Sequence, residues 1–211
     1  MKVELHLHTS RYSGCAVDSP PELMTELIAA GYDAVFLTEH DAVWPDPELA
    51  ELRGHFPGLT ILPGVELSLD DGRAFQHLLV LGTNDPAFVE LARADRPDAA
   101  AILDQARAAG CPTVLAHPFR WDGGSAMLRR GLRPDAIELR TCNHGPEHAA
   151  VSAATARGLN LPLVNAGDVH SLEMIGQFWI ETARPVTCAA ELREMLLAGE
   201  YANCPDESEP A

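Results

Sequence analysis

Histidine and carboxylate side chains recur along the chain next to short apolar runs. The first two, His6 and His8, stand two residues apart in KVELHLH. Imidazole nitrogens and carboxylate oxygens are the donors that borderline divalent cations such as Zn, Mn or Fe accept. A single histidine is more often a surface or hydrogen-bonded residue than a metal ligand, so the prediction of a metal centre depends on a whole set of residues. That set is His6, His8, His40, Glu66, His77, His117, Asp168 and His170.

Most of these candidate ligands close a predicted strand. AVFLTEH ends at His40, PGV precedes Glu66, VLAH ends at His117, and VNAGDVH ends with Asp168 and His170 nearby. In barrel enzymes, the active groups gather at the C-terminal ends of the strands. We therefore expect these side chains to converge at one end of a barrel.

The first predicted strand orients its histidines by alternation. A period of two places successive side chains on opposite faces of a strand. One face of KVELHLH then carries Val3, Leu5 and Leu7, and the other carries Glu4, His6 and His8. We expect the apolar face to pack on helices and the polar face to point into the mouth of the barrel.

His77 differs from the other candidates because it precedes its apolar run, LLVLG. Between Glu66 and His77, the pair Asp71 and Gly72 is a strong signal for a two-residue hairpin turn. Pairing around that turn places Glu66 directly opposite His77, with Cβ atoms about 5 Å apart. The predicted register therefore allows the two side chains to share one metal ion.

The elements that must position these residues alternate between strands and helices. Helix signals are clearest at residues 19–31, where Ser19 can cap the helix, Glu22 completes a capping box and Gly31 ends it. A polar, proline-rich loop is expected after His40. About seven alternations of strand and helix indicate an α/β barrel or a doubly wound sheet. No GxGxxG or GxxxxGKS/T motif follows a strand, which weakens the nucleotide-binding sheet.

Composition limits the class of protein. The chain has 211 residues, of which 46% are hydrophobic, so it can bury one sizeable core. We predict one domain over residues 1–200 and an acidic tail over residues 201–211. No run of about twenty apolar residues and no leader pattern occurs, which predicts a cytoplasmic protein without a membrane segment. The five cysteines show no CxxC spacing and are expected to be reduced thiols.

The charge of the chain restricts its partners. Asp and Glu outnumber Lys and Arg by 31 to 15, which gives a net charge of −16. Such a charge repels polyanions, so we expect no general nucleic-acid surface. A small anionic substrate is compatible with it if cations in the site offset the field. The sequence leaves the oligomeric state open.

The order of the motifs resembles that of the PHP (polymerase and histidinol phosphatase) family. The matching segments are HLHTS at 6–10, TEHD at 38–41, GVE at 64–66, HLLVLG at 77–82, AHP at 116–118 and GDVH at 167–170. This resemblance implies a distorted seven-stranded (β/α) barrel, similar to a TIM barrel, and a metal-dependent phosphoesterase. It also implies a ligand set for several metals. His6, His8, Glu66 and Asp168 would hold the first, Glu66 would bridge to a second held by His77 and His117, and His40 and His170 would contribute to a third.

The implied reaction is hydrolysis of a phosphate ester on a small phosphorylated molecule or nucleotide. Two cations that share a carboxylate lower the pKa of a bridging water and stabilise the attacking and leaving oxygens. Glu66 and Asp168 are therefore expected to be catalytic. Arg120, which follows the AHP motif, can bind a phosphate oxygen or form a salt bridge at the rim, and Arg11 is a second candidate. His144 is a candidate general acid.

Two other functions are considered. Amidohydrolase barrels also begin with HxH and cleave C–N bonds, but they usually employ a lysine on a middle strand, and Lys2 is the only lysine in this sequence. The other alternative is a non-catalytic PHP module stabilised by metal. The intact ligand set disfavours that module.

The third metal site departs from the family pattern. Relatives usually place an Asp or His about five or six residues after the HxH pair, whereas residues 9–15 here read TSRYSGC. Cys15 could supply a thiolate if a metal lowers its pKa. We therefore predict two to three divalent ions (Zn, Mn or Fe), two of them held firmly and the third weakly.

Overall fold

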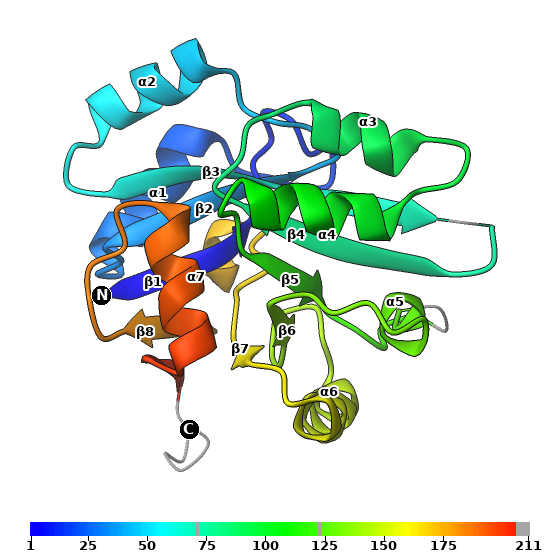
Figure 1. Cartoon of the computed structure of the whole chain (residues 1–211). Helices are drawn as coiled ribbons and strands as arrows, with labels where there is room; N and C mark the ends of the chain where they lie inside the picture. Colours follow the sequence, from blue (N-terminus) through cyan, green and yellow to red (C-terminus); the bar gives the residue numbers. More distant parts are fainter. Residues whose placement is uncertain (71, 122–123, 206–211) are drawn as a thin grey trace.

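The computed structural model describes residues 1–70, 72–121 and 124–205 (Figure 1). Within these residues, nine strands form one mixed sheet: β1 (Lys2–Leu7), β2 (Ala34–His40), β3 (Thr60–Asp70), β4 (Phe75–Leu81), β5 (Thr113–Ala116), β6 (Ala136–Glu138), β7 (Leu163–Val164), β8 (Trp179–Thr182) and β9 (Tyr201–Cys204). The helices are α1 (Pro20–Ala29), α2 (Asp46–His55), α3 (Ala87–Arg93), α4 (Ala99–Ala108), α5 (Ala126–Arg129), α6 (Pro146–Leu159), α7 (Ala189–Ala198) and the short 3₁₀ helix η1 (Leu172–Met174). The helices of the described residues are too short or too polar to cross a bilayer.

The strands follow the order β7-β6-β5-β4-β3-β2-β1-β8-β9 across the sheet. β1, β2 and β3 are parallel, as are β5, β6 and β7, whereas β4 is antiparallel to both of its neighbours. The α/β class predicted from the sequence is confirmed. The expected seven strands are wrong, because β8 adds antiparallel to the edge of β1 and β9 then pairs with β8.

The two edge strands of the sheet are linked by side chains. Tyr201 Oη and Asn203 Nδ2 of β9 both donate to the carbonyl oxygen of Leu163 in β7, at 2.7 and 2.9 Å. The backbone N–H of Asn165 donates to Asn203 Oδ1 at 2.6 Å. These bonds bring the sheet nearly to closure as a barrel. The segment predicted as an acidic tail therefore begins with a paired strand, and its residues 206–211 lie outside the described part of the chain.

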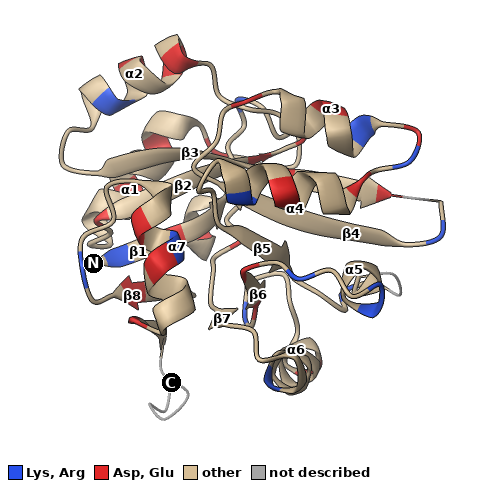
Figure 2. Ribbon diagram, viewed as in Figure 1, with Lys and Arg blue, Asp and Glu red and all other residues tan. Residues whose placement is uncertain are grey.

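Helices cover the sheet and bury three apolar clusters. Leu23 and Leu27 of α1 pack with Leu49 of α2, while Phe88 of α3 and Ile102 of α4 pack over the β3–β4 side. α7 packs with the strand residues of the remaining cluster. Figure 2 shows Asp and Glu on the outer helices α2, α3, α4 and α7. The acidic excess on these helices faces away from the core, as expected for charged side chains.

The helix signals in the sequence match α1 but miss α2. The Glu22 carboxylate accepts a hydrogen bond from the backbone N–H of Ser19 at 2.9 Å, and Gly31 adopts a left-handed φ of 77° just after the helix, as predicted. The loop expected after His40 is wrong in part, because α2 occupies Asp46–His55. A proline in the first turn of α2 is compatible with a helix start, since its missing N–H has no partner there.

β1 does not alternate strictly. Val3 and Leu5 pack in the cluster that includes α7, whereas Leu7 packs in the cluster under α1 and α2. The pairing of β1 with β2 shifts register between Glu4 and Leu7, an irregularity that re-aims side chains. The predicted common face for Val3, Leu5 and Leu7 is therefore wrong.

The hairpin of β3 and β4 has a different register from the predicted one. Asp70 pairs with Phe75, Ser68 with His77, and Glu66 is opposite Leu79. The predicted pairing of residues 66 and 77 is wrong by two positions, because residues 71–74 connect the strands in place of a two-residue turn. Asp71 itself lies outside the described residues. A shift of two keeps every side chain on its face of the sheet, so His77 still faces the same side as Glu66.

Candidate metal centre

The structure brings all eight predicted ligands together at the C-terminal ends of the strands and the start of β4. His6 and His40 lie in β1 and β2, Glu66 in β3 and His77 in β4, while His8, His117, Asp168 and His170 follow β1, β5 and β7. Among the described residues, four overlapping groups have ligand atoms within 4.8 Å of one another. These groups are His6–His8–Asp168, His6–Glu66–His117, His40–Glu66–His77 and His8–His40–His170.

Glu66 lies at the centre of these groups, and its side chain is fully buried. Its Oε1 lies 2.7 Å from His77 Nδ1 and 3.0 Å from His117 Nε2. Its Oε2 lies 2.9 Å from His40 Nδ1 and 3.2 Å from His6 Nε2. The two oxygens of one carboxylate therefore face different sets of imidazoles, so Glu66 would be able to hold two adjacent cations.

The hydrogen bonds of His6 and His8 leave Nε2 of each ring facing the other. His6 Nδ1 lies 2.8 Å from Glu138 Oε1, so Nδ1 carries a proton. Ser13 Oγ donates to Glu39 and lies 3.3 Å from His8 Nδ1, which assigns a His8 proton to Nδ1 as well. The two Nε2 atoms lie 3.0 Å apart, so a proton on one of them or a cation beside both must separate their lone pairs. A metal bound there would take the place of that proton.

Two unpartnered buried oxygens supply a further test of whether a metal fits. Among the described residues, Glu66 Oε2 and Asp168 Oδ1 have no hydrogen-bond partner of suitable geometry. Burying an unpaired carboxylate oxygen is costly unless a cation or donor compensates it. Imidazole nitrogens and carboxylate oxygens together match Zn, Mn or Fe better than Mg or Ca, which favour an all-oxygen shell. The residues present therefore fit borderline divalent ions.

Two carboxylates that support the histidines were missed in the sequence. Glu138 in β6 contacts His6 Nδ1, and its other oxygen accepts a hydrogen bond from the backbone N–H of His117 at 2.5 Å. Glu39 in β2 accepts from Trp44 Nε1 at 3.0 Å and from Ser13, which in turn contacts His8. Such partners fix the tautomer and orientation of a ligating imidazole. A Glu inside an apolar strand, as in AIEL and FLTEH, is the signal that could have found both residues.

The backbone is strained at two of the candidate ligands. His117 and Asp168 adopt positive φ values of 25° and 50°, which non-glycine residues rarely adopt. Each such residue costs on the order of 1–3 kcal/mol and persists only where the surrounding structure holds it. The strain aims both side chains at the centre instead of continuing their strands.

Arg120 lies at the rim of a cleft of about 390 Å³ above the buried ligands. Its Nη1 is 3.9 Å from Asp168 Oδ2, and its side chain is 38% exposed. Arg11 lies elsewhere, in an exposed ion pair with Glu48 at 3.0 Å, and does not line the cleft. Of the two arginines considered from the sequence, only Arg120 is placed to reach a group in the cleft.

His144 lies outside the group of ligands. Its Nε2 is 2.6 Å from the carbonyl oxygen of Pro118, and its Nδ1 is 3.3 Å from that of Leu139. Burial lowers the pKa of His144, and both ring nitrogens face backbone acceptors. The general-acid role predicted for His144 stays a prediction, and these contacts count against it.

Comparisons with known proteins agree with this fold. A family model described as PHP-associated matches residues 146–201, the segment that contains Asp168 and His170. No curated protein matches the chain. Its fold is similar to that of a two-domain protein from Bacteroides vulgatus that contains a predicted PHP-like metal-dependent phosphoesterase, with a TM-score of 0.70, 17% identity and 96% of this chain covered. The chain spans 64% of the length of that protein.

Residues 146–201 thus match the PHP-associated family model, and the chain as a whole is similar in fold to a PHP-like protein.

Two further solved structures share its fold. An amidohydrolase from Chromobacterium violaceum, with bound sulfate and no metal, aligns over 100% of both chains with a TM-score of 0.65 and 18% identity. PsfC from Pseudomonas syringae aligns over 90% of this chain and 86% of its own, with a TM-score of 0.57 and 22% identity. The similarity of fold thus extends well beyond the C-terminal segment that matches the family model.

Charges in the candidate metal centre shift the pKa values of the ligands. Burial lowers the pKa of His6, but the carboxylates of Glu66, Asp168 and Glu138 outweigh burial and raise that pKa well above the usual value. Burial raises the pKa of Glu66, but His6 and His77 outweigh it and hold that pKa well below the usual range. Glu66 therefore stays ionised, and metal binding must displace protons from imidazoles.

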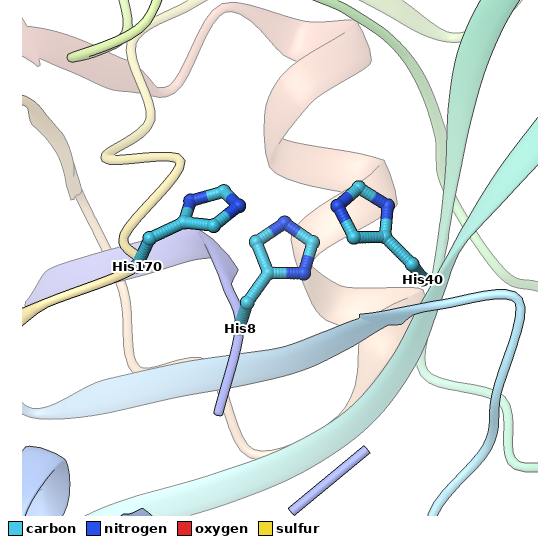
Figure 3. A group of neighbouring side chains, drawn as sticks. All are labelled: His8, His40 and His170. Atoms are coloured by element: carbon cyan, nitrogen blue, oxygen red, sulfur yellow. The ribbon is translucent and has the colours of Figure 1, made fainter. Parts of the chain in front are cut away.

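The third group of the candidate metal centre consists of imidazoles alone. Figure 3 shows His8, His40 and His170 pointing toward one another. The ring centroids of His8 and His40 are 4.2 Å apart, and those of His8 and His170 are 4.3 Å apart. His170 Nδ1 donates to the carbonyl oxygen of Asp168 at 2.9 Å, which leaves Nε2 for a ligand. Cys15 lines the same cleft, but its sulfur is outside the group within 4.8 Å, and burial raises the pKa of its thiol.

We expect two firmly held metals and a third that exchanges easily. The third group lacks an anionic donor, and His8 must be shared with the group that contains Asp168. Equilibrium dialysis against a mild chelator, with metal counted per chain, should therefore remove one ion before the other two. Three equally retained ions would contradict this expectation. Loss of the third ion in Cys15→Ala, but not in Cys188→Ala, would identify the sulfur as an added donor; Cys188 is exposed and lies at the start of α7.

Proposed function

We propose that this chain is a metal-dependent hydrolase that cleaves a phosphate ester on a small phosphorylated molecule. The observation that carries the proposal is the position of Glu66, whose two oxygens face separate groups of imidazoles in a fully buried site. Cations bound there would supply an activated water near neutral pH and would stabilise negative charge on phosphoryl oxygens. The centre would hold two to three ions of Zn, Mn or Fe.

Different residues would bind the metal ions, orient the ligands and bind the phosphate group. Glu66 and Asp168 hold the cations in register, and Glu138 keeps the proton of His6 on Nδ1 so that Nε2 can ligate. Arg120 at the rim would donate two hydrogen bonds to a phosphate oxygen pair, a geometry that guanidinium matches well. Most of the ligands are buried, and the cleft lined by His40, His77, His117, Asp168 and His170 is where water would reach cations bound there.

The test of this proposal is metal analysis combined with a panel of phosphate esters. Protein purified without chelator should contain at least two transition-metal ions per chain and should hydrolyse at least one phosphate ester when Mn or Zn is added. Absence of hydrolysis across monoesters and diesters, with metal present in full, would support the non-catalytic module instead.

Hydrolysis of C–N bonds is the second candidate, because an amidohydrolase from Chromobacterium violaceum shares the fold. The position of Lys2 disfavours it. Lys2 Nζ donates to the carbonyl oxygen of Ala30 at 3.0 Å and lies over the rings of Tyr32 and Trp179, at the start of β1. It is therefore at the opposite end of that strand from His6, where it cannot ligate. A parallel panel of amides and cyclic ureas separates the two candidates.

Replacing Arg120 with Met should weaken phosphate binding about 10- to 100-fold. A hydrogen bond to a charged group contributes about 1.5–3 kcal/mol, and about 1.4 kcal/mol is a factor of ten in affinity. Inhibition by inorganic phosphate measures the effect, and metal content should not change. Arg11→Met is the matched control, because Arg11 is an exposed arginine that does not line the cleft. Equal phosphate inhibition in the two variants would show that Arg120 does not bind phosphate and only forms contacts at the rim of the cleft.

A further inference from the structure

A cavity of about 780 Å³ lies beside the metal centre. Its walls come from the loop after β6, from one face of α6 and from the residues before β8 (Figure 1). Asn143 lines both this cavity and the cleft of the metal centre. Its Nδ2 donates to Asp168 Oδ2 at 2.9 Å, so a molecule in contact with Asn143 from the cavity side is next to a candidate metal ligand.

The cavity is lined by apolar and polar side chains together, and Arg140, Thr141 and His144 are among the polar ones. Ala149, Ala150 and Ala153 form its wall on α6, and small side chains at these positions leave the space open. Phe178 adds an aromatic ring, and Gln177 adds an amide at the rim. Such a mixture, mostly apolar with a few polar groups, is typical of sites for small organic molecules, which range over about 300–1,000 Å³.

The cavity is also placed where a leaving group would have to go. The cleft above the ligands is about 390 Å³ and is lined by imidazoles and Arg120, which suits a phosphate group. Both spaces lie at the C-terminal ends of the strands, the end at which barrel enzymes bind substrates. A phosphate ester with its phosphorus in the cleft would extend its organic part past Asn143.

We propose that this cavity receives the organic part of the substrate, and that this part carries a ring. The inference rests on the proposed phosphoester hydrolysis and narrows its substrate class to ring-bearing phosphate monoesters. The ring packs against Phe178 and the alanines of α6, while Asn143 lies at the junction between the organic part and the phosphate.

Two neighbouring alanines of α6 provide a matched pair of variants. Ala153 lines this cavity, whereas Ala154 lines a separate, shallower cavity with Phe119 on the next face of the helix. Ala153→Leu fills the proposed site, and Ala154→Leu adds the same side chain outside it. Leucine is a good helix former, so neither change should disturb α6.

Binding is measured by calorimetry on the metal-loaded protein with phenyl phosphate, adenosine 5′-monophosphate and methyl phosphate. We expect at least one ring-bearing ester to bind tenfold more tightly than methyl phosphate. Ala153→Leu should abolish that difference, Ala154→Leu should preserve it, and methyl phosphate should bind all three proteins equally. Phe178→Ala should reduce the difference as well. Metal content, measured for each variant, shows whether the centre is intact.

Two results would overturn the inference. One is equal affinity of the wild-type protein for all three esters, and the other is an unchanged ring preference in Ala153→Leu. These binding measurements need no turnover, so they stand apart from the hydrolysis test. A protein that prefers ring-bearing esters but cleaves none would retain the cavity assignment and refute the proposed reaction.

Discussion

Glu66→Gln will reduce phosphoester hydrolysis by about 10³-fold or more and will lower the metal content of the protein. The amide has the shape of the carboxylate but lacks its charge, and one of its two atoms cannot accept. Oε1 and Oε2 of Glu66 face different imidazole groups, so one substitution weakens two sites. The loss of several kcal/mol of charge stabilisation corresponds to about three powers of ten in rate.

The measurement is the initial rate on the best ester of the panel, together with metal counted per chain. Glu147→Gln is the control, because Glu147 is a 72% exposed carboxylate on α6. Folding of the Glu66 variant is checked by circular dichroism. Normal turnover with a full complement of metal in Glu66→Gln would refute the bridging role.

Removing the metals will lower the melting temperature by about 8–16 °C. A ligand present at about 1,000 times its Kd stabilises the folded state by about 4 kcal/mol, and each kcal/mol moves the midpoint by roughly 2–4 °C in a chain of this length. The physical source is the centre itself. In it, Nε2 of His6 and Nε2 of His8 face each other at 3.0 Å, and two carboxylate oxygens are buried without hydrogen-bond partners in the described structure.

Thermal melts of the chelated protein, before and after addition of Mn or Zn, measure this shift. Ca is the control ion, because it prefers an all-oxygen shell. Glu66→Gln should respond far less to Mn or Zn than the unaltered chain. Equal melting temperatures with and without transition metal would show that the centre contributes nothing to folding.

The sequence predicted the class of the fold and the convergence of eight side chains for one reason. Strand ends are marked by a change from apolar to polar residues, and parallel strands bring such ends to one edge. The runs ending at His40 and His117 carried that signal clearly. The helix of residues 20–29 was equally predictable, because Ser19, Glu22 and Gly31 are local signals that need no tertiary contact.

The remaining features depend on contacts between distant segments. The irregular pairing of β1 arises from its partner β2, and no pattern within KVELHLH encodes it. β9 pairs with β8, and its Tyr201 and Asn203 find an acceptor at Leu163, some 40 positions earlier. The Glu in AIEL indicates a buried carboxylate, but the sequence does not show that its partner is His6. Contacts between such pairs of distant residues determine structural features that the periodicity of the sequence does not predict.

The connection between β3 and β4 has a consequence for how this chain can vary. Ser68 pairs with His77 while Glu66 lies on the same face, so a shift of the β3–β4 register by two residues would slide β4 by about 7 Å along its partner and still present His77 to the same side. A register shift of one residue would turn His77 toward the helices α3 and α4. A change in the length of this connection is therefore compatible with the centre where it leaves the register unchanged or shifts it by an even number of residues.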